Sequence, residues 1–199
     1  MTEWTLVQHK HTRHSFDSLT EPRWLVERAE ELGIDVIGLF LDREHDEPSA
    51  ARLCDAIHES GGLTLLPHPY RWHNLDEELL SRIDLIEVHN SRTAAADNER
   101  AVELARARRR PGVAGPDAHR IGELTLARNL FGGERPADDD GLKAALLHAP
   151  RRFEINIGSE WDEWISQGVM LVRRPTARGA WRLARGAVRR ILKRGDSES

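Results

Sequence analysis

The chain has 199 residues, of which 39% are hydrophobic and 31% charged, so its size and composition predict one folded domain rather than a disordered chain. Its formal net charge of −4 is unevenly distributed: residues 173–194 carry nine Lys or Arg and no acid, and the acidic remainder would repel nucleic acid unless bound metals reverse the local charge. No stretch is long and apolar enough to span a membrane, no secretory signal starts the chain, and the single Cys54 excludes a disulfide framework and favours the cytoplasm.

Strands and helices are predicted to alternate along the chain. Short apolar or β-branched runs predict strands at residues 5–11, 34–41, 63–66, 84–88, 112–115 and 153–157. Capping residues and helical spacing predict helices at residues 20–33, 47–59, 75–82, 94–108 and 141–149, whereas residues 124–131 fit either state. This alternation indicates an α/β fold built on a mostly parallel sheet or barrel. The composition changes only near Arg173, which divides the chain into a body at 1–172 and a basic tail at 173–199.

Residues suited to metal binding stand at the ends of the predicted strands. Because the carboxyl ends of parallel strands meet at one edge of a sheet, we expect these side chains to converge. His9 and His11 are two residues apart and would share a face of their strand. Imidazole nitrogens and carboxylate oxygens bind zinc, manganese or iron. A lone histidine at a strand end carries little weight, so the prediction rests on the combination. The residues at the strand ends are His9, His11, Asp42, His68, His89, Asn90, Asp117 and His119.

The other histidines lack this placement. They are His14, His45, His58, His73 and His148. Of these, His58 and His148 fall on predicted helices and are expected to be surface or capping residues. Cys54 also falls within a predicted helix, where a packed thiol is more common than a nucleophile.

Four motifs occur in a fixed order along the chain. They are His9-Lys10-His11-Thr12, Pro67-His68-Pro69-Tyr70, the segment at 86–92 that contains His89-Asn90, and Gly115-Pro116-Asp117-Ala118-His119. In this order the motifs resemble those of the PHP family, named for its polymerase and histidinol-phosphatase members, with Pro116 where that family commonly has serine. The resemblance covers about residues 5–131.

This resemblance implies a distorted TIM-like barrel of strand–helix units whose C-terminal face holds one to three divalent metals (Zn, Mn or Fe) that activate water against a phosphoester. Asp17 and His119 would transfer protons, and Arg92 would join them at the catalytic site. Arg71, Arg92 and Arg120 each follow a motif, and their guanidinium groups are suited to holding phosphate oxygens. The metal ligands implied by the resemblance are His9, His11, Asp17, His68, Asp117 and His119, with His89 or Asn90 beside them.

The chain departs from the family pattern after Gly33-Ile34-Asp35, where a strand–helix–strand block with a histidine and a glutamate ligand is missing. Fewer ligands hold fewer ions, so one well-held metal is the safer expectation. Asp42, Glu44 or His45 would be the candidates to replace the lost ligands. A barrel shortened in this way would expose strand edges, which the C-terminal segment or a second subunit of a homo-oligomer would need to cover.

Three functions are open from the sequence alone. The first is a cytoplasmic metal-dependent phosphoesterase acting on a small phosphorylated substrate or a short oligonucleotide. The second is a catalytically degenerate PHP-like module that binds a metal or ligand and has a regulatory or scaffolding role. The third is a hydrolase that cleaves a different bond with the same metal ligands.

The basic tail is predicted to form an amphipathic helix, because apolar residues recur at helical spacing from Trp181 to Leu192 within a segment, 173–194, that carries nine basic side chains. Such a helix would dock on the acidic body or contact a membrane surface, a nucleic acid or a second subunit.

Overall fold

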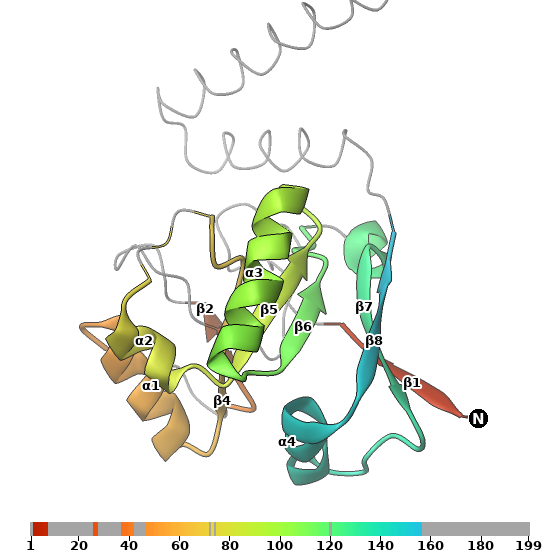
Figure 1. Ribbon diagram of the computed structural model, residues 1–199. Coiled ribbons are helices and arrows are strands. Elements are labelled where there is room, and N and C mark those ends of the chain that lie inside the picture. The colour runs from red at the N-terminus through yellow and green to blue at the C-terminus, as the bar shows by residue number, and fades with distance from the viewer. Residues whose placement is uncertain are drawn as a thin grey trace, which may run out of the picture.

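The computed structural model describes residues 2–7, 26–27, 37–41, 47–71, 73, 75–119 and 121–156. These residues form a mixed α/β fold with two sheets (Figure 1). The strands are β1 (Glu3–Leu6), β2 (Val26–Glu27), β3 (Ile37–Leu39), β4 (Leu63–Leu66), β5 (Leu85–Asn90), β6 (Gly112–Gly115), β7 (Ala127–Gly132) and β8 (Arg151–Ile155). The helices are α1 (Ala50–Glu59), α2 (Glu77–Arg82), α3 (Ala95–Arg108) and α4 (Asp139–His148), with a 3-10 turn, η1, at Ile121–Thr125.

The larger sheet has the strand order β2-β3-β4-β5-β6. Strands β4, β5 and β6, of which β6 is at the edge of the sheet, are parallel, as the sequence predicts. In contrast, β3 is antiparallel to β4, and β2 is antiparallel to β3. The sheet is therefore mixed, and neither sheet closes into a barrel within the described residues.

The smaller sheet is antiparallel throughout, with β7 between β1 and β8. The completely buried side chain of Asn129 on β7 links this sheet to β6. Its carboxamide oxygen accepts the Ala114 N–H at 2.9 Å, and its nitrogen donates to the carbonyl of Ala114 at 2.8 Å and to that of Leu6 at 3.2 Å. One side chain thus reproduces the pairing that a backbone peptide group would make between neighbouring strands.

Helix boundaries follow local capping chemistry. Ser49, Asp76 and Asp138 each accept a backbone N–H from the first turn of α1, α2 and α4, which satisfies a donor that has no partner within the helix. After α3 the chain turns at Arg109, whose φ of 53° lies in the left-handed region.

Both faces of β4 are covered, in agreement with its continuous apolar sequence. On one face, Leu66 packs in a cluster with Cys54, Ile57 and Ile83 from the segments around α1 and α2. On the other face, Leu65 belongs to the cluster that includes Phe131 of β7. Figure 1 shows α1 and α2 beside one another and α3 along β5.

The prediction that Cys54 is packed is confirmed. Its side chain is fully buried, and burial raises the pKa of its thiol to about 12, so that it stays protonated at neutral pH.

The helix predicted at 20–33 is wrong for the two of its residues that are described. Val26 and Glu27 form β2 and pair with Gly38 and Ile37 of β3. Pairing with an available strand edge outweighs the helical spacing of this segment, because propensity is a weak guide where tertiary contacts compete. The other residues of the predicted helix, together with the basic tail at 173–199, lie outside the described residues. Along the described part of the chain, no helix combines the length and apolarity needed to cross a bilayer.

Candidate functional site

Four of the predicted site residues gather where β4, β5 and β6 end. His68 follows β4, Asn90 ends β5, and Asp117 and His119 follow β6. All four side chains are buried, although each is polar or charged. Because these three strands are parallel, their carboxyl ends lie at one edge of the sheet, which we call the carboxyl edge.

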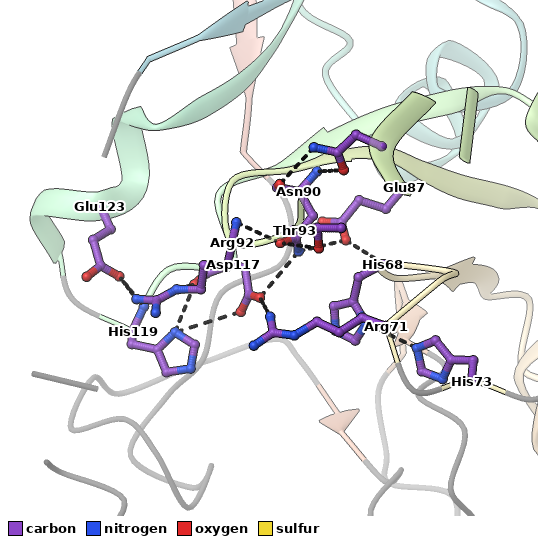
Figure 2. Close-up of polar contacts among 11 residues, drawn as sticks. His68, Arg71, His73, Glu87, Asn90, Arg92, Thr93, Asp117, His119 and Glu123 are labelled. Atoms are coloured by element: carbon purple, nitrogen blue, oxygen red, sulfur yellow. Dashed lines mark hydrogen bonds and ion pairs between the residues drawn. The ribbon is translucent and has the colours of Figure 1, made fainter. Parts of the chain in front are cut away.

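Glu87, in the middle of β5, connects the segments that leave β4 and β5. One of its carboxylate oxygens accepts the backbone N–H of His68 at 2.7 Å and the side-chain amide of Asn90 at 2.9 Å. The same amide nitrogen lies 3.3 Å from a carboxylate oxygen of Asp117. Asn90 therefore joins β5 to the loop after β6, and Figure 2 shows these side chains directed toward one another.

His119 is held in one tautomer by the backbone. Its Nδ1 lies 2.8 Å from the carbonyl oxygen of Asp117, which can only accept a hydrogen bond. Nδ1 must therefore carry the proton, and Nε2 keeps the lone pair that can accept a proton or coordinate a metal. A backbone carbonyl on the second ring nitrogen is the arrangement common in metal-binding histidines.

A buried ion pair supports the backbone around His119. One oxygen of Glu123 accepts the backbone N–H of His119 at 2.7 Å and Nη2 of Arg92 at 2.9 Å. Nε of Arg92 donates to the carbonyl of Asp117 at 2.8 Å. Arg92, predicted to contact substrate, thus binds the loop that carries Asp117 and His119.

Arg71, which is about one quarter exposed, reaches the same loop from the segment after β4. Its Nη1 donates to a carboxylate oxygen of Asp117 at 3.2 Å. Figure 2 shows Asp117 between the Arg71 guanidinium and the His119 ring. The carboxylate of Asp117 therefore already has a positively charged neighbour.

His68 and His73 form a stacked pair, with ring centroids 5.1 Å apart and planes 3° apart. Nδ1 of His68 lies 3.1 Å from Nε2 of His73, so one nitrogen donates and the other accepts. Burial lowers the pKa of His73, which keeps its ring neutral near pH 7.

His89 is not part of this network. Its Nδ1 lies 3.4 Å from the side-chain nitrogen of Asn98 on α3, whereas Asn90 reaches Asp117. The pairing of β5 with β6 is irregular between Glu87 and His89, and Asn90, not His89, lies on the side of Glu87. Burial also lowers the pKa of His89.

The backbone is strained at two of the gathered residues. His68 has a φ of 27° and Asp117 a φ of 49°, in the left-handed region that residues with a Cβ rarely adopt. Strain of this kind persists only where surrounding contacts fix the conformation, and it concentrates at functional sites. Here the contacts of Glu87, Asn90 and Arg92 provide that fixation.

The remaining predicted residues, namely His9, His11, Asp17, Asp42, Glu44, His45 and Arg120, lie outside the described residues. The strand before Asp42 and Glu44 was expected to run parallel to β4. This expectation is wrong, because β3 is antiparallel and Leu39 pairs with Leu63 at the start of β4. The end of β3 therefore lies at the opposite edge. Within the part of the chain that is described, no three His, Cys, Asp or Glu residues lie together as a metal site.

Sequence reasoning missed four residues that build the site: His73, Glu87, Glu123 and Asn98, whose side chain binds the backbone N–H and carbonyl of Asn90. Glu87 had a detectable signal, because a carboxylate within the apolar run at 85–88 must find buried partners. Neither His73 nor Glu123 has a comparable signal, since their roles depend on how two loops fold.

Comparisons with known proteins agree with the motifs. The family model described as PHP-associated matches residues 95–149. The structure of PsfC from Pseudomonas syringae PB-5123 is 17% identical, with 75% of this chain and 64% of that chain covered and a TM-score of 0.49. A two-domain protein from Bacteroides vulgatus ATCC 8482, "containing predicted PHP-like metal-dependent phosphoesterase", is 14% identical, with 71% of this chain and 47% of that chain covered and a TM-score of 0.51.

The chain thus spans less than two thirds of the length of both structures, and no curated protein matches it. At this identity the Bacteroides structure shows a shared fold, and the PHP-associated model adds a match in sequence. Together with the ordered motifs, these findings support a likeness of this chain to the PHP family.

Proposed function

We propose that this chain is a divalent-metal-dependent phosphoesterase that acts on a small phosphorylated substrate or a short oligonucleotide at the carboxyl edge. The observation that supports the proposal is the buried contact of Nδ1 of His119 with the Asp117 carbonyl, which would make Nε2 the ring nitrogen that binds a metal. The name of the Bacteroides structure, a protein with a PHP-like metal-dependent phosphoesterase, supports the same activity.

The donors at the carboxyl edge suit a divalent cation of the zinc, manganese or iron type. Asp117 and His119 would supply an oxygen and a nitrogen ligand, His68 would supply a second nitrogen, and His9, His11 and Asp17 would complete the set. When bound, such an ion supplies Lewis-acid activation of water and of a phosphoryl oxygen.

Arg71 and Arg92 would have different roles, one in binding substrate and one in positioning the site. Arg71 is partly exposed and beside Asp117, so its guanidinium can bind a phosphate oxygen of the substrate with charge-assisted hydrogen bonds. Arg92 is only 11% exposed and engaged by Glu123 and the Asp117 carbonyl, which assigns it a positioning role for His119.

The test is hydrolysis of p-nitrophenyl phosphate and of bis-p-nitrophenyl phosphate by the purified chain, with added Mn²⁺, Zn²⁺ or Fe²⁺. Asp117→Asn should lower kcat/KM by about 100-fold or more, because it removes the charge of a ligand near the reacting phosphate. The control is Asp140→Asn on α4, where the carboxylate is 95% exposed and should be dispensable. Equal activity of the Asp117→Asn variant and the wild type would contradict the proposal.

One observation favours a second function, a non-catalytic module that binds a metal or ligand. The Arg71 guanidinium lies 3.2 Å from Asp117, so part of the charge of this carboxylate is already neutralised without a metal. Metal binding without turnover of either phosphoester, in a folded sample, would support the module over the enzyme.

A further inference from the structure

A cavity of about 420 Å³ opens between the end of α3, the start of β6 and the turn from α4 into β8. Gly112, the first residue of β6, lines it, whereas Asp117 follows the last residue of the same strand. The cavity therefore lies at the opposite end of β6 from the carboxyl edge. Figure 1 shows the lower end of α3 and the helix α4 on this side of the molecule.

Three arginines line the cavity, and the described residues provide no counter-ion for them. They are Arg106, Arg110 and Arg151, and no Asp or Glu is among the lining residues. Arg110 donates to the carbonyl of Ser81 at 3.0 Å, but within the described residues none of the three pairs with a carboxylate. Arg108, in the same helical turn as Arg106, pairs with Glu77 instead. The cavity thus concentrates positive charge that the described residues leave uncompensated.

Arg151 is fixed in position by the end of α4. Its Nη2 donates to the carbonyl of Leu146, and lies 3.3 Å from that of Ala145 and 3.4 Å from that of Ala149, at the C-terminal end of α4. Its Nη1 is buried without a hydrogen-bond partner among the described residues, and its guanidinium lies 4.9 Å from the centroid of the Phe131 ring. Burial lowers the pKa of this guanidinium to about 10, because a cation removed from water without an anion is destabilised. An anion in the cavity would relieve this cost.

The rest of the lining is apolar. Val88 and Leu147 contribute to the cavity wall, and Val102 and Phe153 are 40% and 37% exposed. Its volume is within the range of small-molecule pockets. Guanidinium groups bind phosphate through paired N–H donors, and a phosphate monoester with nearly two negative charges balances several arginines better than a carboxylate does.

We propose that this cavity binds a small organic phosphate, with the phosphate held by Arg106, Arg110 and Arg151 and an apolar ring packed on Val102 and Phe153. The inference does not depend on the proposed phosphoesterase activity, because it uses no residue of the carboxyl edge.

The test is isothermal titration of the full chain with adenosine 5′-monophosphate in the presence of EDTA, which suppresses metal-dependent binding at the carboxyl edge. We expect saturable binding of one ligand per chain. The double variant Arg106→Gln/Arg110→Gln should weaken binding by about tenfold or more, and adenosine without phosphate should bind at least about tenfold more weakly. The matched control is Arg52→Gln, an exposed arginine of α1 outside the cavity, which should change affinity by less than about twofold.

Three results would overturn the inference. They are the absence of saturable binding to the wild type, unchanged affinity of the double variant, and loss of binding in Asp117→Asn, which would assign the ligand to the carboxyl edge. If the double variant does not fold, Arg106→Gln alone provides the same comparison, because Arg106 is exposed and has no partner among the described residues whose loss would unfold the chain.

Discussion

At the scale of single residues, the ion pair of Arg92 and Glu123 differs from the surface ion pairs because it is buried and positions the site. Arg92 is 11% exposed and Glu123 only 2%, and between them they hold the backbone of Asp117 and His119. Removing one partner of a buried pair leaves the other charge in a poorly solvated place, which is strongly destabilising.

We therefore expect Arg92→Gln to lower the free energy of unfolding by about 3 kcal/mol, measured by urea denaturation. The matched change is Arg152→Gln, because Arg152 forms an exposed ion pair with Glu3. It should cost far less, because exposed ion pairs contribute little to stability. Similar losses for both variants would show that the Glu123 pair does not stabilise the loop.

Cys54 gives a second expectation at this scale. Its thiol is fully buried with a pKa of about 12, so iodoacetamide should label it at neutral pH only when the core around α1 opens. The folded pKa is above the unfolded value of about 8.5, so the stabilising contribution is complete below that value and is lost as the pH rises toward 12. Mass spectrometry after labelling with and without urea measures this protection. Rapid labelling of the native protein at pH 7 would contradict the buried assignment.

At the scale of secondary-structure elements, the side chain of Asn129 links the smaller sheet to β6 of the larger sheet. Its carboxamide makes both hydrogen bonds with the peptide groups of Ala114 and a third with Leu6, at the end of β1.

Replacing this side chain by Asn129→Ala should cost about 2–4 kcal/mol of unfolding free energy, because it leaves the buried N–H and carbonyl of Ala114 without partners. Denaturant unfolding of the variant measures the loss. The comparison is Asn156→Ala, whose amide donates to the Thr125 carbonyl at an exposed position and should cost less than about 1 kcal/mol. A loss no larger than in this control would mean that water replaces Asn129.

The sequence predicts some elements better than others for physical reasons. Residues 63–66 and 112–115 match β4 and β6 because a strand buried on both faces requires a continuous run of apolar or small residues. In contrast, β2 has only two residues and no periodicity, and it exists because β3 offers an edge. The antiparallel direction of β3 is also absent from local sequence, since direction depends on how the chain returns after α1.

At the scale of the whole molecule, the described residues place two chemically different regions at opposite ends of β6. The carboxyl edge has acidic and imidazole side chains, whereas the cavity at the start of β6 has arginines and apolar walls. Sequence reasoning could locate the first region, because its residues follow strand ends in one order. It could not locate the second, because Arg106, Arg110 and Arg151 are ordinary surface residues until α3 and β8 bring them to the same cavity.

The backbone conformation of His68 and Asp117 has a consequence for how this chain can be changed. Both positions adopt angles that glycine accepts most readily, so a chain optimised for stability alone would lose an imidazole and a carboxylate there. Under the proposed function, stability and metal chemistry thus make opposing demands at these two positions.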